Sequence, residues 1–148
     1  MVVAVSPQGV LHASVIERLN LLLIEQFGRS AKVRPQLPFA ASGDSLPEPD
    51  LAVTPLDAPR NVHPSRALRI VEVAETSLDT DRAVNSAVYA AADVPEYWIV
   101  DVRRKVVEVY TEAQVDHYGA ARIARSGDVI ELVAAAGKSV VVAEIFAA

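Results

Sequence analysis

Proline placement divides this chain into segments that can form helices and a segment that cannot. Seven of the nine prolines lie between residues 35 and 64, namely Pro35, Pro38, Pro47, Pro49, Pro55, Pro59 and Pro64. Proline lacks a backbone N–H and clashes with the preceding helical turn, so this stretch has room only for short extended pieces. The best of these are residues 31–36 and 50–54, and longer elements are expected on either side.

Before the prolines, apolar residues recur at helical spacing. They are Leu11, Val15, Ile16, Leu19, Leu22, Leu23 and Phe27. Gly28 follows where a left-handed helix cap is favoured. The pattern predicts one amphipathic helix over residues 11–27.

After the prolines, residues 68–74 form a nearly continuous apolar run that is interrupted by Arg69 and Glu72. Such a run is typical of a central strand that is covered on both faces. A second helix is predicted from a cap at Thr76, Ser77 or Asp79 to about residue 92. We expect Val84, Ala87, Val88 and Ala91 to form its buried stripe, with Asp81, Asn85 and Tyr89 on its other side.

The remaining sequence favours strands. Residues 96–101 and 105–110 predict a hairpin across the charged turn 102–104, and further strands are expected at 114–118, 128–133 and 139–146. The order of elements predicts an α/β (α+β) fold with a mixed sheet flanked by helices and extra antiparallel C-terminal strands. No linker separates two parts, so we expect a single domain over residues 1–148.

Composition excludes several functions. The chain has no cysteine, which rules out disulfides, thiolate ligands and thiol nucleophiles. Its net charge of −5 gives no long-range basic field for non-specific binding of duplex DNA. We find neither a membrane-spanning apolar run nor a signal peptide, so a cytoplasmic protein without a membrane partner is expected.

Acidic residues suggest a site for a divalent cation. Glu72, Glu75, Asp79 and Asp81 lie within ten residues, and Asp50 begins a predicted strand. Hard carboxylate oxygens suit Mg²⁺ or Mn²⁺, which would polarise a phosphoryl group and lower the pKa of a bound water. The alternative is that these acids only cap helices and face solvent.

Several motifs, taken in order, resemble one protein family. They are Pro49-Asp50-Leu51-Ala52-Val53, Ile70-Val71-Glu72-Val73, Asp81-Arg82, Tyr89-Ala90 and Val94-Pro95-Glu96-Tyr97-Trp98-Ile99-Val100-Asp101, with Ser6-Pro7-Gln8-Gly9 and His12 upstream. Together they resemble the Uma-two family (domain of unknown function 820) of restriction-endonuclease homologues, within the PD-(D/E)XK nuclease superfamily. The resemblance covers residues 5 to 110.

This resemblance implies a restriction-endonuclease-like core, DNA as a partner, and a Mg²⁺ (or Mn²⁺) site formed by Asp50 and Glu72, with Asp81 orienting the groups around it. The family's lysine would fall on Ala74 or Asn85. Asn85 can donate a hydrogen bond but adds no charge, and loss of such a donor typically costs about 10² to 10³ in rate. Lys32 is the first other lysine to inspect, and Arg82 points to a different part of the helix surface.

Two functions therefore remain open. The first is a Mg²⁺-dependent endonuclease that uses Asp50, Glu72, Asp81 and Asn85. The second is a degenerate nuclease-fold protein that serves as a binding or oligomeric scaffold. Relatives carry a segment before Ser6, whereas this chain begins inside the expected first strand at residues 1–5, so it is expected to be N-terminally short, with exposed apolar surface that favours a homodimer.

For the other candidates, a structural role is expected, and for most of them a functional role is the alternative. His12 is expected to be a hydrogen-bonded structural residue, with metal ligation or base catalysis as the alternative. Tyr97 and Trp98 are expected in the core, with base stacking as the alternative. Glu75 has the opposite strand parity to Glu72 and is expected to point away from it. Residues 103–105 predict a solvated turn, with phosphate contact as the alternative.

Overall fold

The structure is a computed structural model of the chain, and it describes residues 9–41, 45–133, 135 and 137–147. The strand expected at residues 1–5 and most of the motif at residues 6–9 lie outside the described residues. Within the described part of the chain, no helix is both long and apolar enough to cross a membrane.

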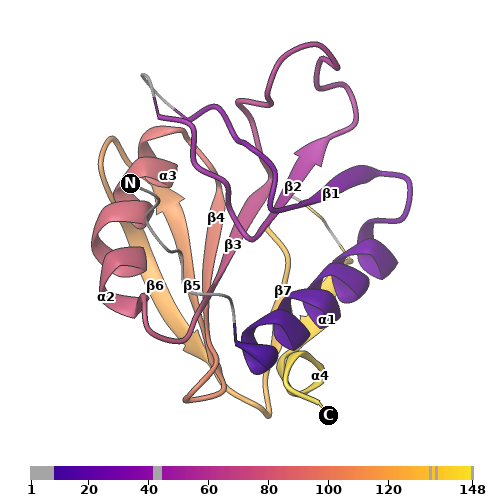
Figure 1. The fold of residues 1–148 in the computed structure, drawn as a ribbon, viewed down its shortest axis with the longest axis vertical. Coiled ribbons are helices and arrows are strands. Elements are labelled where there is room, and N and C mark those ends of the chain that lie inside the picture. The colour runs from indigo at the N-terminus through magenta and orange to yellow at the C-terminus, as the bar shows by residue number, and fades with distance from the viewer. Residues whose placement is uncertain (1–8, 42–44, 134, 136, 148) are drawn as a thin grey trace, which may run out of the picture.

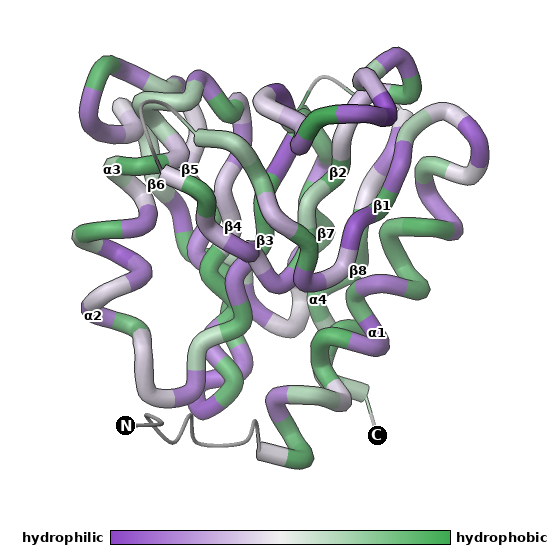
Figure 2. The backbone as a smooth tube through the Cα atoms, turned by 45° about the horizontal axis from the view of Figure 1, so that its top comes forward, coloured by the Kyte–Doolittle hydropathy of each residue, from purple (hydrophilic) through white to green (hydrophobic). Residues whose placement is uncertain are grey.

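The first helix, α1 (Val10–Phe27), confirms the predicted periodicity. Its buried residues are Val15, Ile16, Leu19, Leu23 and Phe27, all of which the spacing places on one side. Figure 2 shows hydrophobic and hydrophilic residues interleaved along it. The chain leaves the helix at Gly28, which has φ +52° and donates its N–H to the Ile24 carbonyl over 2.7 Å. Glycine adopts this φ without steric cost.

Six strands form a mixed sheet in the order β1-β2-β3-β4-β5-β6. The pairing of β3 with β4 is parallel and the other four pairings are antiparallel. The strands are β1 (Ala31–Pro35), β2 (Leu51–Pro55), β3 (Arg69–Ala74), β4 (Glu96–Asp101), β5 (Val106–Ala113) and β6 (Tyr118–Ala124). The central strands β3 and β4 are almost wholly buried, as the apolar run predicted.

A helical crossover connects the parallel strands, as parallel pairing requires. It consists of α2 (Leu78–Thr80), a π-helical turn η1 (Asp81–Asn85) and α3 (Ser86–Ala91). Figure 1 shows this segment on one side of the sheet and α1 on the other side. A two-stranded sheet of β7 (Val129–Glu131) and β8 (Ser139–Val141), followed by α4 (Val142–Ile145), packs on the α1 side.

The predicted buried stripe of the crossover is wrong at Val84 and Ala91, which are exposed, whereas Val88 is half-buried against the core. Val84 is 57% exposed, whereas Asp81 and Tyr89 are buried. Tyr89 packs between the rings of Phe39 and Tyr97, with ring centroids 6.3 and 5.1 Å away. The side of the crossover that carries Asp81 and Tyr89 therefore faces the sheet. Ring packing of Tyr89 and hydrogen bonds to Asp81 hold it there.

Two predicted strands also differ from the structure. The strand expected at 114–118 lies instead at Tyr118–Ala124, because the chain turns at 114–117, where Gln114 N–H donates to the His117 carbonyl. The strand expected over 139–146 ends at Val141, and the next four residues form α4. The rest of the sheet lies within a few residues of its predicted position.

Candidate functional site

Asp50 and Glu72 are held together by two hydrogen bonds, one from the Asp50 backbone and one from the backbone of Val73, the residue after Glu72. Asp50 N–H donates to Glu72 Oε1 over 2.9 Å, and Val73 N–H donates to Asp50 Oδ2 over 2.7 Å. The antiparallel pairing of β2 with β3 produces this contact. Leu51 lies opposite Val71, so Asp50, just before Leu51, comes beside Glu72, just after Val71. Each carboxylate commits one oxygen to a backbone N–H and keeps its second oxygen for other partners.

The π-helical turn brings a third acid to this pair. Asn85 Nδ2 donates to Asp81 Oδ1 over 2.7 Å and lies 3.4 Å from Glu72 Oε2. Ser77 Oγ donates to the other Asp81 oxygen over 2.8 Å. Asn85 therefore links Asp81 to Glu72, and the four residues predicted from sequence lie in one cluster, which we call the acid cluster: Asp50, Glu72, Asp81 and Asn85. Wider π-helical turns often occur at functional sites.

Two more side chains border the acid cluster. His12 Nε2 donates to the Val73 carbonyl over 2.6 Å and lies 3.9 Å from Asp50 Oδ2. Its Nδ1, like the Tyr89 hydroxyl, is buried and has no hydrogen-bond partner among the described residues. Gln36, which sequence reasoning missed, donates its backbone N–H to the Asp50 carbonyl over 3.1 Å. Only its position opposite Asp50 after β1 could have indicated it.

The carboxylates of the acid cluster repel one another and are partly shielded from solvent. Burial, followed by the charges of Asp50 and Asp81, raises the pKa of Glu72 to about 8. Burial also raises the pKa of Asp50 and that of Asp81 above their ordinary values. Burial and the three nearby carboxylates raise the pKa of Tyr89. A cation bound among these groups would remove the cause of the repulsion.

Other cationic side chains lie elsewhere. Lys32 lies opposite Thr54 at the far end of β2, about 13 Å along the strand from Asp50. Arg82 Nε donates to both Glu108 oxygens, at 2.9 and 3.1 Å, on β5. Neither contributes charge to the acid cluster, and Arg82 points away as its helical position predicted.

The remaining candidate residues lie in the core or in bends and turns of the chain. Tyr97 and Trp98 are fully buried, which confirms that they belong to the core. Glu75 lies near Gly9, where an added Cβ would be 3.1 Å from Glu75 Oε2. The turn after β4 is set by Asp101 Oδ1, which accepts the N–H groups of Arg103 and Arg104.

The donors present suit a hard divalent cation bound partly through water. Mg²⁺ is often held by one or two carboxylates and keeps several waters. The unpartnered Tyr89 hydroxyl beside three carboxylates also leaves a polar group for a bound ion's hydration shell. Among the described residues, no three His, Cys, Asp or Glu side chains form a ready-made metal centre. The residues therefore fit a two-carboxylate site and not a fully protein-lined one.

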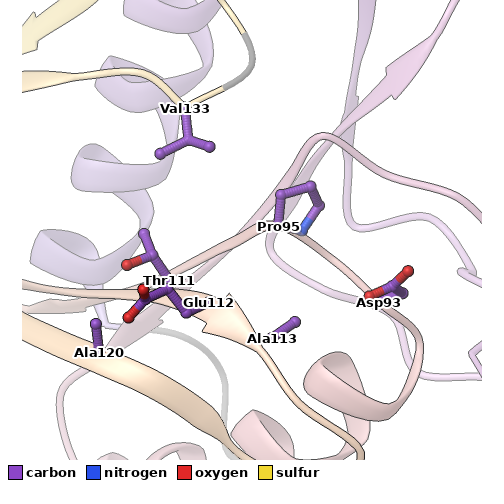
Figure 3. Close-up of a pocket in the computed structure, with 7 residues that line it drawn as sticks. All are labelled: Asp93, Pro95, Thr111, Glu112, Ala113, Ala120 and Val133. Atoms are coloured by element: carbon purple, nitrogen blue, oxygen red, sulfur yellow. The ribbon is translucent and has the colours of Figure 1, made fainter.

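A wide hollow of about 690 Å³ lies at the opposite end of the sheet from the acid cluster. Figure 3 shows it between Pro95 at the start of β4, Thr111 at the end of β5, and Val133. Its charged lining groups are Asp93 and Glu112, both acidic. The hollow is therefore not suited to a phosphate backbone.

A mixed sheet with a parallel central pair, helices on both faces and acids at the β2–β3 junction defines the restriction-endonuclease-like class of folds. The chain belongs to the Uma2 family, whose model, described as "Putative restriction endonuclease", matches residues 1–143. This confirms the resemblance of its sequence motifs.

Among solved structures, the chain is similar to "a putative nuclease belonging to DUF820" from Anabaena variabilis ATCC 29413. The TM-score is 0.70 at 14% identity, and the match covers 98% of this chain and 84% of that chain. At this identity the match shows a shared fold. No curated protein matches the sequence.

Proposed function

We propose that this chain is a divalent-metal-dependent nuclease that hydrolyses phosphodiester bonds in DNA. The observation that carries the proposal is the acid cluster itself, in which the buried Asp81 and the half-buried Asp50 and Glu72 converge without a lysine or arginine among them. Negative charge concentrated in this way lowers the stability of the folded chain unless a cation neutralises it. Membership of the Uma2 family supports the nuclease reading.

In this proposal Asp50 and Glu72 hold Mg²⁺ or Mn²⁺. A bound divalent ion supplies Lewis-acid activation of a phosphoryl oxygen and acidifies water. The backbone N–H groups of Asp50 and Val73 fix the two carboxylates before any ion arrives. Asp81, held by Ser77, orients the Asn85 amide, which donates a hydrogen bond where the family has a lysine.

A second candidate function, a scaffold that does not cut, is suggested by Asn85, which stands where the family has a lysine. An amide cannot supply the positive charge that stabilises a developing phosphorane, so turnover would be slow. The chain would then act as a metal-binding scaffold of the same fold, and it would bind a nucleic acid or a second copy of itself without cutting. We favour the nuclease because both carboxylates that hold the ion are present.

The test is cleavage of supercoiled plasmid and of single-stranded DNA with Mg²⁺ or Mn²⁺. We expect wild type to cut and Glu72→Ala to lose the activity. Glu75→Ala is the matched control, since it removes the same charge three residues away and should cut like wild type. Calorimetric titration with Mn²⁺ runs in parallel. Ion binding without cutting would favour the scaffold, and absence of both would overturn the metal site.

A further inference from the structure

A small cavity between β1, β2 and the loop after β2 is lined by positively charged side chains. Lys32 and Arg34 on β1 and Arg60 on the loop line it together with Thr54, and its volume is about 190 Å³. None of the described residues that line it carries a carboxylate. We call it the basic cavity. It has the volume of about six water molecules, which is enough for a phosphate group with part of its hydration shell.

Strand pairing explains why these residues meet. Lys32 lies directly opposite Thr54, so their side chains are on the same face of the sheet, and Arg34 follows two residues later on that face. Pro59 and Pro64 in the loop form further parts of the wall, and proline restricts the backbone that carries Arg60. Asp57 of the same loop is engaged by Arg66 and not by these cations.

An unpartnered hydroxyl in the wall of the basic cavity points to a ligand. Thr54 is fully buried, and its Oγ1 has no hydrogen-bond partner among the described residues. A buried hydroxyl without a partner is destabilising, and three like charges around it repel one another. A tetrahedral oxyanion would remove both costs. It accepts a hydrogen bond from the hydroxyl, and its negative charge pairs with the lysine and the two arginines.

We propose that the basic cavity binds a phosphate group, through Lys32, Arg34, Arg60 and the Thr54 hydroxyl. The group could be inorganic phosphate or a phosphate of a nucleic-acid strand, and both present the same tetrahedral oxygens. Alternation along β2 places Thr54 on the same face as Asp50, about 13 Å away. This is the axial rise of about four nucleotides. Binding does not rest on the proposed cleavage, since it requires no metal.

The first measurement is calorimetric titration of the full chain with inorganic phosphate in a chelating buffer of constant ionic strength. We expect saturable binding that weakens about tenfold or more in Arg60→Ala, in line with the loss of a charged hydrogen bond. Arg66→Ala is the matched control, because it removes the same charge from the same loop without touching the basic cavity, and it should bind like wild type. Thr54→Val should fold normally and weaken binding several-fold.

The second arm identifies the source of the phosphate. A fluorescein-labelled single strand without terminal phosphates is titrated by anisotropy in the same buffer. Loss of affinity in Arg60→Ala but not Arg66→Ala assigns the basic cavity to a strand phosphate, and binding of inorganic phosphate alone assigns it to the free ion. Equal effects of the two arginine variants in both arms, or no binding in either, would overturn the site. Both arms are run with a chelator, whereas the nuclease proposal is tested by cleavage with Mg²⁺ or Mn²⁺, so failure of the nuclease proposal is seen separately.

Discussion

Asp50 and Glu72 each depend on the other's strand for position. The N–H of Asp50 donates to Glu72 Oε1 over 2.9 Å, while Asp50 Oδ2 accepts the N–H of Val73, the residue after Glu72. The two carboxylates are therefore fixed by strand pairing and not by flexible side-chain contacts. A site built in this way is ordered before a ligand binds, which lowers the cost of binding.

The free energy of unfolding without metal should fall as pH rises from about 4.5 to about 8. Glu72 has a pKa of about 8 in the folded chain against an ordinary 4.5, so the folded state binds this proton more tightly than the unfolded state. The contribution of Glu72 to the free energy of unfolding is fully present below pH 4.5 and is lost by about pH 8. The slope is at most about 1.4 kcal/mol per pH unit.

Denaturant unfolding with a chelator at pH 5 and pH 8 measures this slope. In Glu72→Gln the slope should be shallower than in wild type, because the variant cannot ionise there. Mg²⁺ should restore stability of wild type at pH 8 by favouring the ionised form. An identical pH slope in wild type and Glu72→Gln would show that Glu72 titrates normally.

Replacing Asn85 with lysine should increase cleavage by about 10² to 10³, since it restores a charged donor between Asp81 and Glu72. Single-turnover cleavage of plasmid measures the change. Val84→Lys is the control, because it adds the same charge at the neighbouring exposed position. If Val84→Lys raises the rate equally, the gain comes from general attraction to DNA and not from the site.

Removing the Tyr89 hydroxyl should stabilise the metal-free chain by about 1 kcal/mol. The hydroxyl is buried without a partner among the described residues, so Tyr89→Phe removes a desolvation cost while keeping the ring contacts with Phe39 and Tyr97. Thermal denaturation with and without Mn²⁺ measures it. Greater stability without the ion, combined with weaker Mn²⁺ binding, would place the hydroxyl beside the bound ion's waters. Lower stability without the ion would contradict the prediction.

Arg69 should be the most sensitive charged residue for folding. It is fully buried, donates to Glu96 over 3.0 Å and to the Val133 carbonyl over 3.1 Å, and so attaches the segment after β7 to the sheet. Arg69→Met should cost about 3–5 kcal/mol of folding stability, because it removes the cationic partner of the buried Glu96 side chain.

Arg66→Met provides the matched comparison for Arg69→Met. Its partner is Asp57, and both side chains are largely exposed, so the loss should be below about 1 kcal/mol. Denaturant unfolding gives both values, and hydrogen exchange should show faster opening of β7 and β8 in Arg69→Met alone. Similar stability losses in the two variants would contradict the prediction that Arg69 attaches the segment after β7 to the sheet.

Residue periodicity predicted the local elements well where one face is uniformly apolar. The helix α1 and the strands β3 and β4 lie where their patterns place them. Small residues at 119–121 have weak strand preference, and for this reason β6 was misplaced. The inward face of the crossover was misplaced in the prediction, because the packing of Tyr89 and the contact of Asn85 with Glu72 outweigh the apolar pattern at Val84.

Local periodicity and ordered motifs were enough to predict the family, the mixed sheet and the four residues of the acid cluster. The folded chain was needed to show that Asn85 reaches Glu72, and that Lys32 lies with Thr54 and Arg60. The physical reason is strand register. A shift of one residue reverses every side chain, and register depends on the pairing of distant segments, which no single segment encodes.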